Sequence, residues 1–407
     1  MTTIQDLAAD RSGPDPQQLR GSNQSGMRAY NERLVLSLVR RDGALSKSDI
    51  ARMTGLSAQT VSVIMRALEA DGLLARGEPV RGKIGQPSVP MSLAADGAYF
   101  FGLKIGRRSV DLVLIDLLGQ PVALRRQTYR YPSPDAVVQF VSQNLPALTA
   151  RLTPEQRARI GGLGVAMPFQ LWSWAQHIDA PSGALDVWQD FDIVTALSSL
   201  CEMPVYVQND ATAACGAELV FGTGDRPRDF LYFYIGFFIG GGLVLDGRLF
   251  AGRTGNAAAV GPLPVPGPDG RMRRLMTVAS LSTLANGLQD AGHDPDQLWE
   301  RPGPWTVPPD VLDRWIAGAA DGLASATLSA ATLIEIDTVM IDGWMPSDIR
   351  DRLVNATTAA FQRLDLAGVT QPVIRAGTVG PQARELGAAA IPLSQRFLVD
   401  QSAMLKG

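Results

Sequence analysis

Polar side chains with hydrogen-bonding capacity cluster in one short stretch near the start of the chain, residues 57–68. A glutamine can pair with adenine through two hydrogen bonds, and serine or threonine hydroxyls can reach bases or phosphates. We expect Gln59, Thr60 and Ser62 to contact bases and Ser57 and Arg66 to contact phosphates. The chemistry predicted here is recognition of double-stranded DNA.

A helix-turn-helix is the element that would position these side chains. Ser46 or Ser48 is a candidate N-cap for a first short helix, Gly55 supplies the tight turn, and Ser57 caps a second helix. A small helical bundle with a solvated polar face is the alternative reading. The apolar residues of the second helix recur at helical spacing: Val61, Ile64, Met65 and Leu68.

A basic, turn-rich segment follows Asp71-Gly72. Two short extended runs flank a tip that contains Arg81 and Lys83, which is typical of a wing lying along the phosphate backbone. The glycines and proline of this segment would also suit an ordinary linker. We expect Arg81 and Lys83 to contact DNA phosphates.

Length and charge place this element at the front of a larger protein. The chain has 407 residues and a net charge of -3, whereas residues 27–85 hold ten Lys/Arg against six Asp/Glu, a net of +4. A basic front on an acidic body fits a DNA-binding module joined to something that does not bind DNA. Two cysteines make no disulfide framework, and no apolar run would span a bilayer, so we expect a cytoplasmic, nucleoid-associated protein without a membrane partner.

The body, from residue 99 onward, reads as two similar α/β lobes. Residues 99–130 and 229–252 each predict a meander of three strands, and helices and further strands follow each meander. A helix is expected over residues 135–152, kinked or ended early by Pro146. The predicted domains are a disordered tail (1–26), a winged helix-turn-helix (27–93), lobe 1 (97–210) and lobe 2 (211–407), with a C-terminal helix that can return to lobe 1.

The whole pattern resembles the ROK (repressor, open reading frame, kinase) family in its transcriptional-regulator branch. This resemblance implies an α/β fold: an N-terminal winged helix-turn-helix joined to a two-lobed, actin-like ATPase body of the sugar-kinase type. The motifs that carry it are GQP at Gly85–Pro87, VQNDATAACGAE at Val207–Glu218, IGGGLVLDGRLFAG at Ile239–Gly252, GNAAAVGPLPV at Gly255–Val265 and ELGAAAIPL at Glu385–Leu393.

The phosphate-binding turns of the family's kinases are altered in this chain. Lys104 stands at the position of an aspartate, and Arg107-Arg108 replace small residues of the first turn. An anion-binding turn needs small residues so that backbone amides can approach phosphate. Gly236-Phe237-Phe238 and Asp342-Gly343-Trp344 replace the other two turns. We therefore expect no catalytic residue, no ATP or other cofactor, and no kinase activity.

The family's zinc site is also altered. Pro262 replaces the histidine, the following segment has no cysteine, and the two histidines of the chain, His177 and His293, are isolated. Zinc needs several nitrogen or sulfur ligands in one place. We expect no metal.

The family's sugar clamp survives only in part. The resemblance implies that Asn209 and Asp210 bind ligand, whereas Ala259, Pro262 and a position near Met276 replace the other polar groups. Alternatively, the pair is structural, with Asp210 as a helix N-cap. Ser182 is a further candidate for the cleft, although the alignment could shift this position to Ala184. Trp172, Trp174 and Trp188 could also stack on a ligand there, and core packing is the alternative for each of them.

Two functions follow from these expectations. In the first, the chain is a repressor that binds an inverted-repeat operator as a homodimer or homotetramer and responds to a sugar or related metabolite in the cleft. In the second, the body binds no small molecule and serves as a platform for dimerisation or a protein partner.

Overall fold

The computed structural model describes residues 24–79, 88–172, 180–267 and 269–399. Arg81, Lys83, the GQP motif, Trp174 and His177 lie outside these ranges, as do residues 1–23. The N-terminal head consists of α2 (Gln24–Asp42), α3 (Lys47–Thr54), α4 (Ala58–Ala70), β1 (Leu74–Arg76) and β2 (Met91–Leu93).

Side-chain caps fix the helix-turn-helix as the sequence predicts. Ser46, not Ser48, is the N-cap of α3 and forms a capping box with Asp49. Gly55 ends α3 with φ 70°, a left-handed conformation that glycine adopts without steric cost. Ser57 caps α4 by accepting a hydrogen bond from the Thr60 amide. The four apolar residues predicted for α4 are its buried face: Val61, Ile64, Met65 and Leu68.

The flanks of the head refine the predicted boundaries. Strands β1 and β2 pair antiparallel, from Leu74 opposite Leu93 to Arg76 opposite Met91, so the two extended runs form the base of a wing rather than a linker. Helix α2 begins at Gln24, and residues 24–26, which we assigned to a disordered tail, are helical.

Two five-stranded sheets with the same strand pattern form the two lobes, as expected. In each sheet a three-stranded antiparallel meander is followed by two parallel strands, in the orders β5-β4-β3-β6-β7 and β10-β9-β8-β13-β14. The 3₁₀ turn η1 (Ala95–Gly97) joins the head to β3. The strands of the first sheet are β3 (Tyr99–Ile105), β4 (Ser109–Asp116), β5 (Pro121–Thr128), β6 (Ile160–Met167) and β7 (Val205–Asn209); those of the second are β8 (Phe230–Ile235), β9 (Ile239–Leu245), β10 (Arg248–Leu249), β13 (Thr338–Gly343) and β14 (Val373–Ala376).

Lobe 1 has one face covered by local helices. Helix α5 (Pro134–Thr149) packs on β4 and β5, and it buries the apolar side chains of Val137, Phe140, Val141, Leu145 and Leu148. It continues three residues past Pro146 and ends at Thr149, before the expected end at residue 152. Leu145 and Leu148, on either side of the proline, are both buried in the core and hold the last turn in place. The short elements here are α6 (Pro154–Arg157), η3 (Asp186–Gln189) and α7 (Ile193–Ser198).

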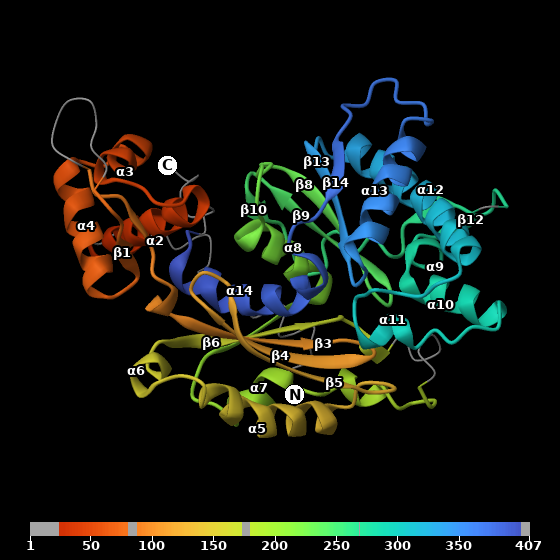
Figure 1. Cartoon of the computed structure of the whole chain (residues 1–407), viewed down its shortest axis with the longest axis horizontal. Coiled ribbons are helices and arrows are strands. Elements are labelled where there is room, and N and C mark those ends of the chain that lie inside the picture. Colours follow the sequence, from red (N-terminus) through yellow and green to blue (C-terminus); the bar gives the residue numbers. More distant parts are fainter. Residues whose placement is uncertain (1–23, 80–87, 173–179, 268, 400–407) are drawn as a thin grey trace.

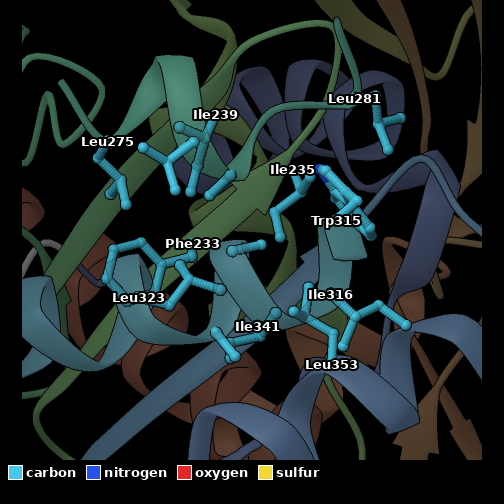
Figure 2. Close-up of a cluster of buried hydrophobic side chains, with 14 of the residues drawn as sticks. Phe233, Ile235, Ile239, Leu275, Leu281, Trp315, Ile316, Leu323, Ile341 and Leu353 are labelled. Carbon is cyan, nitrogen blue, oxygen red and sulfur yellow. The ribbon is translucent and has the colours of Figure 1, made fainter. Parts of the chain in front are cut away.

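Lobe 2 has a large apolar core behind its sheet. Along β8, Leu231, Phe233 and Ile235 face this core, whereas the alternating Phe230, Tyr232 and Tyr234 face the opposite side. Figure 2 shows Phe233, Ile235 and Ile341 meeting Trp315, Ile316 and Leu353 from the covering helices. The remaining elements of this lobe are β11 (Pro264–Pro266), β12 (Met272–Arg274), α9 (Met276–Ala279), α10 (Leu281–Asp290), α11 (Gln297–Glu300), α12 (Pro309–Leu333) and α13 (Ser347–Phe361).

The C-terminal helix α14 (Ala383–Phe397), preceded by η4 (Gly380–Gln382), returns to lobe 1. It packs against β3 and β6 on one side and against α8 (Asp210–Phe221) on the other, between the sheet of lobe 1 and lobe 2 (Figure 1). The approach is close: a Cβ atom on Gly164 would lie 1.8 Å from the Ala388 carbonyl oxygen, and one on Gly387 would lie 1.9 Å from the Ala213 carbonyl oxygen.

The head is joined to the body through one continuous apolar core. Buried head residues such as Val35 and Leu36 belong to the same cluster as Phe100 of lobe 1 and Tyr232 of lobe 2. Polar contacts add to it: Arg40 donates to the Leu117 carbonyl, and the Val399 amide donates to Ser37 Oγ over 3.0 Å. Across the described residues, no helix is both long and apolar enough to cross a lipid bilayer.

We predict that Gly164→Ala lowers the free energy of unfolding by about 2–4 kcal/mol, because the added methyl group overlaps the backbone of α14. Gly318→Ala is the matched control, because an added Cβ on this helical glycine would meet no described atom within 4 Å. This substitution should raise the free energy of unfolding by about 0.5–1 kcal/mol. Urea denaturation followed by circular dichroism measures both. Equal stability of Gly164→Ala and the native protein would contradict the close packing.

Candidate functional site

The exposed face of α4 carries the side chains predicted to read DNA. Ser57, Gln59 and Arg66 are exposed, and Thr60 and Ser62 are half-buried. The hydroxyls of Ser57 and Thr60 lie 2.8 Å apart and share a hydrogen bond. The structure therefore brings these five predicted contacts together on one surface, with Gln59 projecting at the start of the helix.

Two further residues share this surface and were missed by sequence reasoning. Lys47 Nζ donates to Ser62 Oγ over 3.2 Å, which brings a cation from α3 beside the recognition helix. Val63 is 45% exposed, although valine is usually buried, and it offers an apolar contact for a thymine methyl group. In the sequence, Val63 falls outside the apolar stripe of α4, and this position could have identified it as exposed.

A second candidate site is a cavity of about 160 Å³ between the two lobes. Its walls combine backbone of glycine turns with a few polar side chains, which is the usual composition of a small-molecule site. The residues that line it include Arg107, Gln170, Asn209, Asp210, Phe238, Ala259, Pro262 and Met276.

Asn209 and Asp210 have distinct roles in this cavity. Asn209, not Asp210, is the N-cap of α8: its Oδ1 accepts hydrogen bonds from the amides of Ala211 and Thr212. Our assignment of the cap to Asp210 was therefore wrong, and the reason is that the helix begins one residue earlier than expected, at Asp210 itself. The Asp210 carboxylate lies 3.4 Å from the guanidinium of Arg384.

The positions at which the resemblance predicted lost polar groups line this same cavity. Ala259, Pro262 and Met276 all contribute to its wall, together with the surviving Asn209 and Asp210. Ser182 is exposed and is not one of the lining residues. Trp188 is fully buried in lobe 1, where its indole N–H donates to the Pro132 carbonyl, so it serves core packing.

Backbone strain occurs at the edge of the cavity. Gln170 has φ 57° and Ala258 has φ 55°, and both belong to segments that line the wall. A left-handed conformation in residues other than glycine costs of order 1–3 kcal/mol and tends to persist at binding sites. Gln170 belongs to the loop after β6, on the lobe 1 side of the cavity.

The altered first phosphate turn is filled by side chains. Lys104 is buried, with its Nζ 2.9 Å from an Asp111 carboxylate oxygen and 2.6 Å from Ser109 Oγ. Arg107 stacks over the Phe238 ring at 4.6 Å and Arg108 over the Phe237 ring at 5.5 Å. Only a small hollow, about 20 Å³, lies among these groups. Side chains therefore fill the first altered turn.

The third altered turn is likewise occupied. The Asp342 carboxylate accepts hydrogen bonds from the Gly380 amide and the Tyr232 hydroxyl, and Trp344 is buried beneath Arg126. Burial raises the pKa of Asp342, and the amides of Gly380 and Gly343 oppose that rise. These contacts give the turn a structural role.

No group of three or more His, Cys, Asp or Glu side chains suited to a metal occurs in the parts of the chain that the structure describes. Pro262, at the position of the family's histidine, instead forms part of the cavity wall.

Comparison with known proteins identifies two family models that match this chain. The profile of the ROK family matches residues 100–275, and a winged helix-turn-helix DNA-binding profile matches residues 28–75. Residues 100–275 therefore form a ROK family domain. The winged helix-turn-helix precedes it as the sequence predicted.

Several known proteins are similar to this chain along much of its length. Protein y4fQ of Sinorhizobium fredii, whose name describes it as uncharacterized, is 26% identical over 91% of this chain and 92% of its own. The xylose repressor of Bacillus subtilis is 21% identical over 60% of this chain and 62% of its own length. Transcriptional regulator Rv0485 of Mycobacterium tuberculosis is 29% identical over 57% and 52%, so the chain spans between half and two thirds of these two regulators.

Solved structures show that the fold is shared. A ROK family transcriptional regulator described as a homologue of the E. coli MLC protein superposes with a TM-score of 0.65 at 20% identity, covering 91% of this chain and 96% of that one. A ROK glucokinase from Streptomyces griseus, solved with glucose and AMPPNP, superposes with a TM-score of 0.55 at 21% identity, covering 72% and 98%. The regulator match extends over more of the chain than the body alone, whereas the kinase match covers a share the size of the body.

The buried carboxyl group of Glu385, in the first turn of α14, gives a pH prediction. Burial, with Asp111 nearby, raises the pKa of Glu385 from 4.5 to about 7. Between about pH 4.5 and 7, Glu385 is protonated in the folded protein but ionised in the unfolded chain. The free energy of unfolding therefore falls as pH rises through this window. Well above pH 7, Glu385 is ionised in both states and its effect on the free energy of unfolding no longer changes with pH.

We therefore predict that the free energy of unfolding of Glu385→Gln is close to that of the native protein at pH 4.5 and exceeds it by up to about 3 kcal/mol at pH 8. Urea denaturation at several pH values measures the difference. Glu202→Gln is the control, because that residue is exposed on the surface. A stability difference between Glu385→Gln and native protein that does not change with pH would contradict the prediction.

Proposed function

We propose that this protein is a sequence-specific DNA-binding transcriptional regulator, a repressor, whose affinity for its operator is controlled by a sugar or related metabolite in the interlobe cavity. The observation that carries the proposal is that one molecule has both an exposed recognition surface on α4 and a cavity lined by Asn209 and Asp210. A continuous apolar core joins the head that carries α4 to the body that holds the cavity. The regulators among its relatives, including xylose repressors, support it.

Two-fold symmetry is the natural way for such a head to gain specificity. A homodimer, or a homotetramer made of two dimers, would place two α4 helices in successive major grooves and read an inverted repeat. Arg81 and Lys83 of the wing would hold the DNA backbone beside them. Such a regulator works in the cytoplasm, at the nucleoid.

The body acts in this proposal without phosphoryl transfer. ROK kinases share the fold, but Arg107, Arg108 and the two phenylalanines that they stack on occupy the region of the phosphate turns. Asp210, which lines the cavity, serves as a hydrogen-bond acceptor for ligand, held in place by Arg384. Closure of the lobes around the ligand would change the spacing of the two heads.

We predict that Gln59→Ala lowers affinity for the operator by about 10-fold or more while leaving affinity for random DNA unchanged, because it removes a base contact. Fluorescence anisotropy with both DNAs at fixed salt measures the ratio. Gln289→Ala, an exposed glutamine of lobe 2, is the control and should leave both affinities unchanged. Equal losses on operator and random DNA would refute the base contact.

We also predict that a sugar from a panel of pentoses, hexoses and amino sugars raises the melting temperature, since a ligand that binds only the folded state stabilises it by mass action. Asp210→Asn should abolish this rise, whereas Asp290→Asn, an exposed residue at the end of α10, should preserve it. An undiminished rise in Asp210→Asn would remove Asp210 from the site, and no rise with any sugar would favour the body as a partner platform.

A further inference from the structure

Helix α4 presents one narrow exposed stripe on the side away from the core of the head, and the helix itself lies at the outer edge of the head (Figure 1). The stripe contains Gln59, Val63 and Arg66. Because an α-helix turns by about 100° per residue, these side chains fall within an arc of roughly 60°. The buried side chains lie on the opposite side of the helix: Val61, Ile64, Met65 and Leu68. A surface that approaches α4 along the stripe therefore meets Gln59, Val63 and Arg66 first.

Val63 is the apolar member of this stripe. It is 45% exposed, whereas the other valine of α4, Val61, is fully buried. The branched side chain of valine restricts its rotamers in a helix, so valine is a poorer helix former than alanine at an exposed position. Apolar surface left in water gains nothing from burial. Neither packing within the head nor helix propensity therefore favours a valine at position 63.

The two hydroxyl side chains that we first expected to contact bases are engaged within the head. Thr60 Oγ1 lies 2.8 Å from Ser57 Oγ, and Ser62 Oγ accepts a hydrogen bond from Lys47 Nζ over 3.2 Å. Thr60 and Ser62 are half-buried and flank the exposed stripe on its two sides. Their bonds orient Ser57 and Lys47, which are groups suited to phosphate contacts.

The charges around the stripe fit a polyanionic partner. Lys47 places a cation on one side, and Arg66, whose Nε donates to the Ser62 carbonyl over 3.1 Å, places another on the stripe. Glu69 is the sole acid in residues 58–70, and its carboxylate pairs with Arg76. An apolar protein surface docked here would bury both cations without a counter-charge, whereas DNA phosphates pair with them.

Double-stranded DNA offers an apolar group to such a stripe. In the major groove that group is the 5-methyl of thymine, and glutamine pairs with adenine through two hydrogen bonds. Gln59 and Val63 are four residues apart, so they point the same way and are separated by about 6 Å along the helix. Base pairs are stacked about 3.4 Å apart. The two side chains can therefore reach base pairs one or two steps apart.

We propose that Gln59 and Val63 are the base-reading pair of α4, and that Val63 recognises the methyl group of one thymine in each operator half-site. Thr60 and Ser62 support phosphate contacts instead, which replaces our expectation that they contact bases. The inference rests on the regulator function proposed above, because it needs an operator. It adds the identity of a base that the operator contains and the side chain that selects it.

Replacement of thymine by uracil tests the inference, because it removes the 5-methyl group and leaves the hydrogen-bonding edges of the base pair unchanged. The operator is first recovered by selection of genomic fragments. Each thymine of a half-site is then replaced in turn, together with its symmetry mate, and the affinity of the full chain is measured by fluorescence anisotropy at fixed salt. The variants are Val63→Ala, Ser62→Ala and, as matched control, Val187→Ala, which alters a valine of lobe 1 that is 52% exposed.

We expect one thymine position at which uracil weakens binding of the native protein by about 3- to 5-fold per half-site, the effect of one buried methyl group. Val63→Ala should bind the thymine and uracil operators at this position with nearly equal affinity, because alanine lacks the two Cγ methyl groups. Val187→Ala and Ser62→Ala should keep the native preference for thymine. Ser62→Ala should also weaken binding to operator and random DNA equally, since it frees Lys47.

The fold of the head survives these changes, because Val63 is exposed and alanine is the better helix former. Three results would overturn the inference: no thymine sensitive to loss of its methyl group, a Val63→Ala protein that keeps the native preference at every position, or loss of that preference in Ser62→Ala. Recovery of no common sequence in the selection is a separate failure, because it removes the regulator function and this inference together.

Discussion

The close approach of α14 to its neighbours is the constraint on which the rest of the structure depends. Gly102 and Gly164 let the helix lie directly on the sheet of lobe 1, and Gly387 lets it touch α8. No side chain larger than hydrogen fits at these positions without moving backbone atoms. Because α8 begins at the cavity and α14 packs on both α8 and the first sheet, this contact joins the two lobes beside the cavity.

The same helix also connects the cavity with the DNA-binding head. Arg384 and Glu385 stand in its first turn, beside Asp210 and Asp111, whereas Phe397 at its far end packs edge-on against Phe100. Two residues further, Val399 bonds to Ser37 of α2. Fifteen helical residues span about 22 Å. A rigid element thus contacts the proposed effector site at one end and the head at the other, which is the physical continuity that regulation requires.

Local signals predicted much of this structure from the sequence. Gly55 and the Ser57 cap defined the helix-turn-helix, and alternating and glycine-rich runs defined both meanders, because these features act over a few residues. The altered clamp at Ala259, Pro262 and Met276 followed from the family resemblance. The Asp210–Arg384 pair could not be predicted, since its partners are 174 residues apart. Continuation of α5 past Pro146 and exposure of Val63 depend on tertiary packing, which no short pattern encodes.

The central claim is that the head reads a specific sequence under the control of the body. Selection of genomic fragments by the purified protein at near-physiological salt, followed by sequencing, tests it most directly. The account predicts enrichment of a shared inverted repeat, with half-sites one helical turn or a multiple of it apart. Recovery of fragments without a common sequence, at the same yield as random DNA, would contradict it.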